Sequence, residues 1–118
     1  TVDEKSETQV MYYHAEPEYI TRQLFDDLLV LEPFGQGNER PILRLTDCRI
    51  VQGKSIGGGK HYKCRILNQN FGFDAIYFWY SGPDFSSRDL YDIYFYVQIN
   101  KWNGQETLQL QIKAITKA

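Results

Sequence analysis

The spacing of apolar residues changes once along this chain, and the change divides it into two parts. In the first part, apolar side chains recur every three or four positions, which lines one face of an α-helix. Pro17 suits the first helical turn, and Glu16 and Glu18 suit its positive end. The helix is expected to end at Pro33 and Gly35. The apolar residues on its predicted face are Ile20, Leu24, Phe25, Leu28, Leu29 and Leu31.

After Pro41 the apolar period becomes two, which is typical of β-strands with one buried face. The first two strands are expected to form a hairpin through the flexible turn QGKSIGGGK. The last two are joined by KWNGQ, where Asn103-Gly104 is a strong signal for a two-residue hairpin loop. Between the hairpins, SGPDFSSRDL breaks the pattern and leaves room for one short helical turn, and TQVMYYHA near the N-terminus predicts a further strand or a terminal arm. The five main strands are predicted at residues 41–52, 61–67, 73–80, 91–100 and 106–115.

Three strands, an irregular or helical break and two more strands form the order of the five-stranded OB-fold, a Greek-key barrel that binds oligonucleotides. A small sandwich or an SH3-like barrel also fits the periodicity. The OB interpretation divides the chain into an acidic arm or strand at 1–16, a linker helix with the elbow EPFGQGN at 17–40, and an OB-fold domain at 41–118.

An OB barrel binds its ligand on strands two and three and on the loops between strands one and two and between strands four and five. Cations that meet phosphates beside flat rings that stack on bases are what single-strand binding requires. The alternative is that the aromatic rings cover edges of the core. The residues predicted to face outward on the two strands are His61, Lys63 and Arg65, and then Tyr77 and Trp79; the loops add Lys54 and Lys60, and then Lys101 and Trp102.

The net charge of −2 is unevenly distributed. Residues 1–39 carry −7, residues 40–65 carry +6 and the remainder carries −1. Such local asymmetry sets the electrostatic field that a polyanion meets. A basic but merely solvated strand face is the alternative.

No set of residues typical of catalysis is found in the sequence. The GGGK turn leads into a strand, whereas a phosphate-binding loop opens a helix. His14 and His61 have no carboxylates nearby at metal-ligand spacing, and Ser86-Ser87 lacks a glycine-flanked nucleophile elbow. We therefore expect neither enzyme activity nor a cofactor in this chain.

The two cysteines, Cys48 and Cys64, lie within strand patterns and are expected to be buried free thiols in a reduced, cytoplasmic compartment. No stretch approaches the roughly 20 apolar residues of a membrane span. The chain begins at Thr1 and is expected to be a segment of a longer protein.

Four stretches resemble motifs of bacterial RecJ-type single-strand-specific exonucleases of the DHH phosphoesterase family. LEPFGQGN at 31–38, followed by Pro41, is similar to the family signature LEPFGxGNPxPxF. KHYKCRIL, DAIYFWY and INKWNGQETLQLQI are similar to strands of the same family, in the same order. Glu39 stands where the signature has proline, and Leu43 where it has phenylalanine. Neither difference threatens the fold.

The resemblance implies that this is the C-terminal OB domain of a 5′-to-3′ single-stranded DNA exonuclease that acts in DNA repair and recombination. The parent catalytic core would use Mn²⁺ or Mg²⁺, but its Asp-His-His motif has no counterpart here, so no catalytic residue or metal ligand is carried over. The domain is expected to hold single-stranded DNA for that core. The alternative is a structural or protein-docking module that closes the nuclease and binds the acidic tail of single-stranded DNA-binding protein. The LEPFGQGN run is interpreted as a rigid joint, since no helix follows its glycines to bind phosphate.

Overall fold

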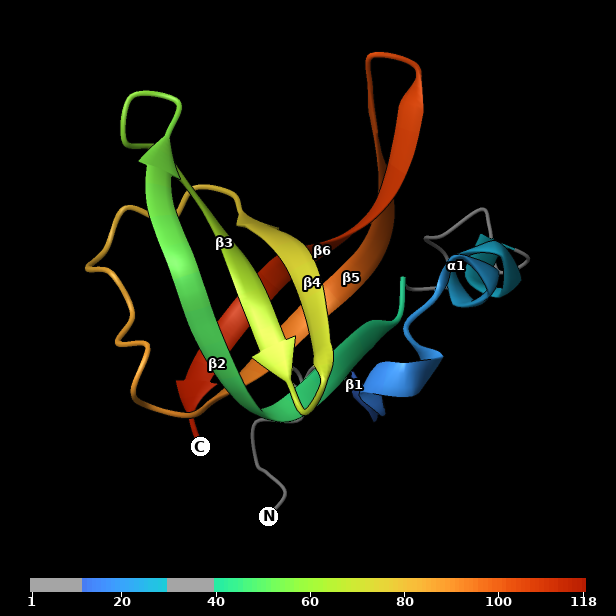
Figure 1. The fold of residues 1–118 in the computed structure, drawn as a ribbon, viewed down its shortest axis with the longest axis horizontal. Coiled ribbons are helices and arrows are strands. Elements are labelled where there is room, and N and C mark those ends of the chain that lie inside the picture. Colours follow the sequence, from blue (N-terminus) through green and yellow to red (C-terminus); the bar gives the residue numbers. More distant parts are fainter. Residues whose placement is uncertain (1–11, 30–39) are drawn as a thin grey trace, which may run out of the picture.

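The computed structural model describes residues 12–29 and 40–118, which form a closed β-barrel with one short helix beside it (Figure 1). The strands of the ring follow the order β2-β3-β4-β6-β5, and β5 pairs again with β2. Neighbours are antiparallel except β4 and β6, which are parallel. This arrangement confirms the predicted five-stranded OB barrel. The elements are β1 (Tyr12–His14), the 3₁₀ turn η2 (Pro17–Tyr19), α1 (Arg22–Leu29), β2 (Ile42–Ile56), β3 (His61–Asn68), β4 (Phe71–Tyr77), β5 (Tyr91–Trp102) and β6 (Gln105–Lys117).

Strand β2 belongs to both halves of the barrel because it bends at two bulges. Its first half pairs with β5 and its second half with β3. The register shifts between Leu45 and Cys48 and again between Val51 and Lys54. A residue with positive φ lies within each shift, Asp47 at 57° and Gln52 at 55°. Bulges of this kind increase the local twist and let one strand turn a barrel corner. They also explain why β2 runs farther than the regular period predicted.

The barrel interior contains the inward-facing side chains that the period of two predicted. Tyr62, Cys64 and Ile66 of β3 are all buried. Both cysteines are free and buried, as expected. The largest fully buried side chains are Phe95, Leu45, Ile50, Ile66, Ile93, Leu110 and Cys48.

The predicted hairpin turn at Asn103-Gly104 is confirmed. These two residues have φ of 50° and 77°, and the flanking Trp102 and Gln105 are paired. Positive φ at both loop positions is the conformation for which Asn-Gly is preferred. In Figure 1 this hairpin and the loop between β2 and β3 project from the same end of the barrel.

The connection from β4 to β5 contains turns and bends but no helix, so the helical turn considered for residues 81–90 does not form. Aromatic side chains cover this part of the barrel instead. Phe85 packs edge-on against Tyr62, and the Tyr62 hydroxyl donates to Asp84. Burial and the Asp84 carboxylate raise the pKa of Tyr62. The Tyr62–Asp84 pair leaves no space beside Gly53, where a Cβ atom would overlap the Tyr62 hydroxyl.

The helical segment before the barrel starts later than predicted. Pro17 begins only the short η2 turn, and α1 begins at Arg22 after a break in the chain direction. The Thr21 hydroxyl accepts the Leu24 amide at 3.2 Å, which is the role of a helix N-cap. Ile20, in the break, is buried in the core. The predicted helix end and the LEPFGQGN elbow lie outside the described residues.

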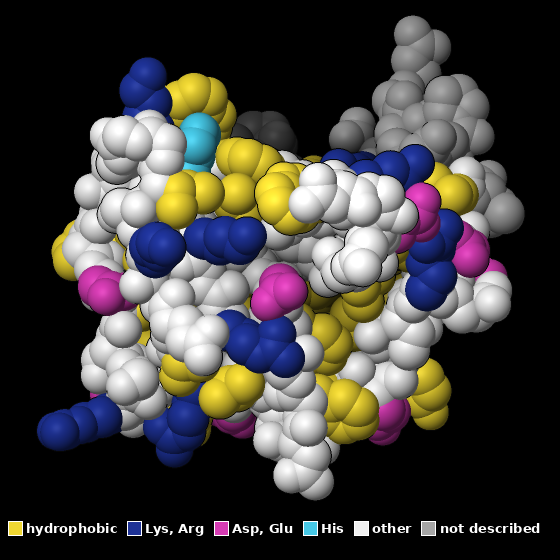
Figure 2. Space-filling model, turned by 45° about the horizontal axis from the view of Figure 1, so that its top comes forward, with side chains coloured by type: hydrophobic (Ala, Val, Ile, Leu, Met, Phe, Trp, Pro, Cys, Tyr) yellow, Lys and Arg dark blue, Asp and Glu magenta, His cyan; other side chains and the backbone are white. Residues whose placement is uncertain are grey.

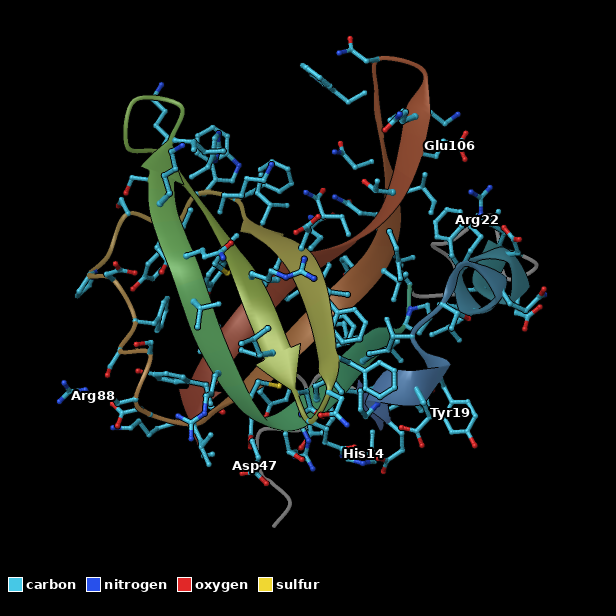
Figure 3. The ribbon with its side chains drawn as sticks, viewed as in Figure 1. His14, Tyr19, Arg22, Asp47, Arg88 and Glu106 are labelled. Atoms are coloured by element: carbon cyan, nitrogen blue, oxygen red, sulfur yellow. The ribbon has the colours of Figure 1, made fainter. Side chains whose placement is uncertain are left out.

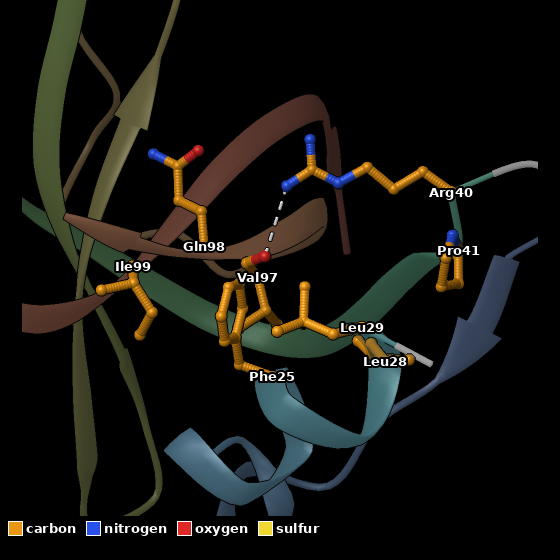
Figure 4. A pocket seen from close by; sticks show the side chains of 8 residues that line it. All are labelled: Phe25, Leu28, Leu29, Arg40, Pro41, Val97, Gln98 and Ile99. Atoms are coloured by element: carbon orange, nitrogen blue, oxygen red, sulfur yellow. Dashed lines mark hydrogen bonds between the residues drawn. The ribbon is translucent and has the colours of Figure 1, made fainter. Parts of the chain in front are cut away.

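Helix α1 rests beside β5 (Figure 4). Phe25 of α1 and Val97 of β5 are among the residues that line a cavity of about 320 Å³ between the two elements. Arg40, just before β2, reaches across it and donates to the Val97 carbonyl at 3.3 Å. Among the described residues, α1 contacts the barrel through Leu24 and Phe25, which pack against the core. No helix in the described residues is long and apolar enough to cross a membrane.

Candidate nucleic-acid interface

The surface that an OB barrel uses for its ligand is here the outer face of β3 and β4, between the β2–β3 loop and the β5–β6 hairpin. Because Tyr62, Cys64 and Ile66 point inward, the alternate residues Lys63 and Arg65 point outward, as predicted. The antiparallel register places Lys63 opposite Ile76 and Arg65 opposite Asp74. This face thus combines two cations, one apolar side chain and one carboxylate.

The outward orientation predicted for Tyr77 is wrong. Tyr77 pairs with the buried Tyr62, so the two side chains share the inner face. It packs against the core and stacks on Tyr80, with ring centroids 4.8 Å apart and planes at 11°. The sequence placed Tyr77 and Trp79 on one outward face, but β4 ends at Tyr77, and the chain turns before Trp79.

Trp79 lies with His61 and Phe78 in an exposed group that we call the aromatic cluster. Trp79 is 76% exposed and Phe78 is 40% exposed. The His61 ring lies edge-on to both, with centroids 4.7 Å from Trp79 and 5.4 Å from Phe78. His61 Nδ1 also accepts the Trp79 backbone N–H at 3.0 Å, which requires that Nδ1 carry no proton. Trp79 has φ of 62°, a conformation that is unfavourable for a bulky side chain and that this hydrogen bond helps to hold.

Lys54 and Lys63 are directly opposite each other on β2 and β3, and both are exposed. We call them the lysine pair. Direct cross-strand partners present their side chains on the same face. Neither lysine, nor Lys60 in the adjacent loop, makes an ion pair within the part of the chain that the structure describes. The three charges therefore face solvent without a carboxylate partner.

Arg65 differs from the lysines because its charge is engaged. Its Nη1 donates to Asp74 Oδ1 at 2.8 Å. The guanidinium also lies over Gly72, where a Cβ atom would be 2.8 Å from Nη2. Arg65 is thus on the predicted face, but it is held along β4 by a carboxylate.

The β5–β6 hairpin carries the other predicted loop residues. Trp102 is 71% exposed beside the turn. Lys101 lies 3.6 Å from Glu106, which also accepts a hydrogen bond from Arg22 of α1 at 2.6 Å. Arg22 lowers the pKa of Glu106. Figure 3 shows these two labelled side chains pointing toward each other from the helix and the hairpin.

Figure 2 shows how the side chains of this face are distributed: a row of hydrophobic side chains runs along one edge, and Lys and Arg side chains lie next to it with a carboxylate among them. The structure brings Lys54, His61, Lys63 and Trp79 together on one side of the barrel end, and places Lys101 and Trp102 on the hairpin.

Three residues of this face were missed by sequence reasoning. Ile76 and Phe78 alternate with Tyr77 and Trp79, so the outward orientation predicted for Tyr77 and Trp79 put them on the inner face. Asp74 was not considered, although the two-residue turn at Gln69 and Asn70 sets the register that places it opposite Arg65. Counting back from that turn would have found it.

Within residues 12–29 and 40–118, no three His, Cys, Asp or Glu side chains lie close enough together to hold a metal ion.

The fold and this surface define an OB-fold domain with an exposed face of lysines and aromatic rings. The model of the RecJ OB domain family matches residues 13–114, and the chain belongs to this family. No curated protein sequence matches the chain.

Two solved structures have a similar fold. RecJ from Thermus thermophilus in complex with Mg²⁺ superposes with a TM-score of 0.70 at 23% identity over 91% of this chain. The same protein in complex with Mn²⁺ superposes with a TM-score of 0.71 at 21% identity over 92% of this chain. This chain spans only 16% of the length of either. At these identities the likeness shows the fold alone.

Proposed function

We propose that this domain binds single-stranded DNA across the outer face of β3 and β4 and holds it for a catalytic core outside this chain. The observation that carries the proposal is the position of the lysine pair beside the aromatic cluster on the face that OB barrels use for nucleic acids. Cations would follow the phosphates, while exposed rings stack on bases without selecting a sequence.

Membership of the RecJ OB domain family supports a parent that is a metal-dependent exonuclease acting on single strands. Its Mn²⁺ or Mg²⁺ would be held by that core. The contribution of this domain is binding and orientation: Lys54, Lys60 and Lys63 provide charge, and Trp79 and Trp102 provide stacking surfaces at the two sides of the barrel end.

The test is a fluorescence-anisotropy titration with a labelled single-stranded oligonucleotide over a series of salt concentrations. We expect weak binding, and the logarithm of the association constant should fall linearly with the logarithm of the salt concentration. The double variant Lys63→Ala/Trp79→Ala should bind more weakly, because it loses one cation and one stacking ring. Tyr19→Ala is a matched control, because Tyr19 is 68% exposed but lies on η2.

A second titration with an acidic peptide in place of DNA tests the docking alternative. The same lysines attract a carboxylate-rich peptide, but such a peptide has no bases to stack on Trp79. If the protein binds the peptide but no oligonucleotide at low salt, the domain is a docking module and the DNA-binding proposal is wrong.

A further inference from the structure

The lysine pair results from an irregularity in β2. Val51 is opposite Arg65, and Lys54 is opposite Lys63, so two residues of β2 face the single intervening residue of β3. This is a β-bulge, and Gln52 at its centre has φ of 55°. With regular pairing, Lys54 would be opposite Tyr62, whose side chain is buried. The bulge therefore turns Lys54 from the inner face to the outer face.

The resulting arrangement is unfavourable for the free protein. Like charges directly opposite each other on adjacent strands are destabilising, and among the described residues no carboxylate bridges this pair. Arg65, the next outward position on β3, shows the contrast, because Asp74 lies opposite it and accepts its hydrogen bond. The charge of Arg65 is thus neutralised within the protein, whereas the charges of the lysine pair are not.

We infer that Lys54 and Lys63 together form a single phosphate subsite, in which both ammonium groups contact the same phosphate. This inference rests on the proposed function. His61 lies two residues before Lys63 on β3, about 7 Å along a strand. One nucleotide can therefore present its base to the aromatic cluster and its phosphate to the lysine pair. Arg65 is excluded from the subsite because Asp74 holds it.

The salt dependence of DNA binding distinguishes a shared phosphate from two separate ones. Each neutralised phosphate of a single strand contributes about 0.7 to the slope of log affinity against log salt. If the lysines share one phosphate, Lys54→Gln or Lys63→Gln alone leaves the slope nearly unchanged, because the other lysine still neutralises it. The double variant then loses about 0.7. Two separate contacts would give a loss of about 0.7 for each single variant and about 1.4 for the pair.

Thermal unfolding without DNA provides an independent measurement. Either single variant should have a higher melting temperature than the wild type at low salt, because the repulsion is removed. Inorganic phosphate should raise the melting temperature of the wild type more than chloride at equal ionic strength, and this difference should be smaller in the double variant, which keeps only the general stabilising effect of phosphate. Lys117→Gln is the control, since Lys117 is at the other end of β6 and pairs with Asp89.

The outcomes separate this inference from the function on which it rests. If the wild type binds the oligonucleotide but the double variant keeps its slope, or loses about 1.4, the shared subsite is wrong and DNA binding stands. If the wild type binds no oligonucleotide at low salt, the shared subsite and the DNA-binding proposal are both wrong.

Discussion

Replacing Trp79 with glycine should separate the stability of the domain from its DNA binding. Trp79 has a left-handed backbone conformation, with φ of 62°, and its side chain is 76% exposed. A bulky residue in this conformation costs about 1–2 kcal/mol, which glycine does not incur. Against this gain, glycine costs about 0.5–1 kcal/mol through the greater entropy of the unfolded chain. Loss of the edge-on contact with His61 costs about 0.5–1.5 kcal/mol more.

These contributions nearly cancel, so the free energy of unfolding of Trp79→Gly should lie within about 1 kcal/mol of the wild-type value. Binding should change much more. A stacked base contributes about 1–3 kcal/mol, so the dissociation constant should rise roughly 5- to 150-fold, at 1.4 kcal/mol for each factor of ten.

Urea unfolding followed by circular dichroism measures the first quantity, and anisotropy with a labelled single strand measures the second. Tyr19→Ala, which removes an exposed ring from η2, should leave the affinity unchanged. An unchanged affinity in Trp79→Gly would refute the stacking role. A loss of several kcal/mol in stability would refute the view that Trp79 is strained and structurally dispensable.

Three further predictions follow from contacts within the barrel. Asp74→Asn should tighten DNA binding severalfold, because it releases Arg65 and removes a negative charge from the face. In anisotropy titrations the salt slope should become steeper by about 0.7, and an unchanged slope would contradict this prediction. Gly53→Ala should lower the free energy of unfolding by about 1–3 kcal/mol in urea titrations, since a methyl group has no room there. If the variant is as stable as the wild type, the neighbouring side chains can move to accommodate the methyl group and the prediction is wrong. Burial raises the pKa of Cys48 to about 11 and of Cys64 to about 12, from an ordinary value of 9.0. The free energy of unfolding should therefore be unaffected by these thiols below pH 9.0 and fall as the pH rises toward 11 and 12. A thiol reagent should label either cysteine only after unfolding, and rapid labelling of the folded protein would contradict this prediction.

The barrel was predictable because alternation and turn chemistry are local. The rows of buried residues on β3 and β5 follow directly from a period of two. The Asn103-Gly104 turn is also a local signal, since both residues must have positive φ. Strand order then followed from the number and spacing of strands, which the OB barrel shares with few other small β-folds.

The errors arose where a strand departs from its regular period. Tyr77 was placed outward because β4 was expected to continue through Trp79, but the strand ends at Tyr77 and the chain turns. Lys54 was assigned to the first loop, but β2 continues past it. A bulge adds one residue to a strand, so every later side chain points to the opposite face of the sheet. The local amino-acid composition does not predict where a bulge occurs. The identity of the charged residues was therefore predictable, while their pairing was not.

The carboxylates on this surface reduce the number of cations that remain available for the proposed DNA binding. Asp74 engages Arg65 and Glu106 engages Lys101, so Lys54, Lys60 and Lys63 remain as the cations on this face without an ion pair among the described residues. Three separate phosphate contacts would give a salt slope of about −2, and a shared contact at the lysine pair would reduce it to about −1.4. Contacts of this kind tolerate any base sequence and weaken as the salt concentration rises. Under the function proposed above, the strand must advance after each cleavage, and a face with few free cations and exposed rings meets that requirement better than a continuous basic groove.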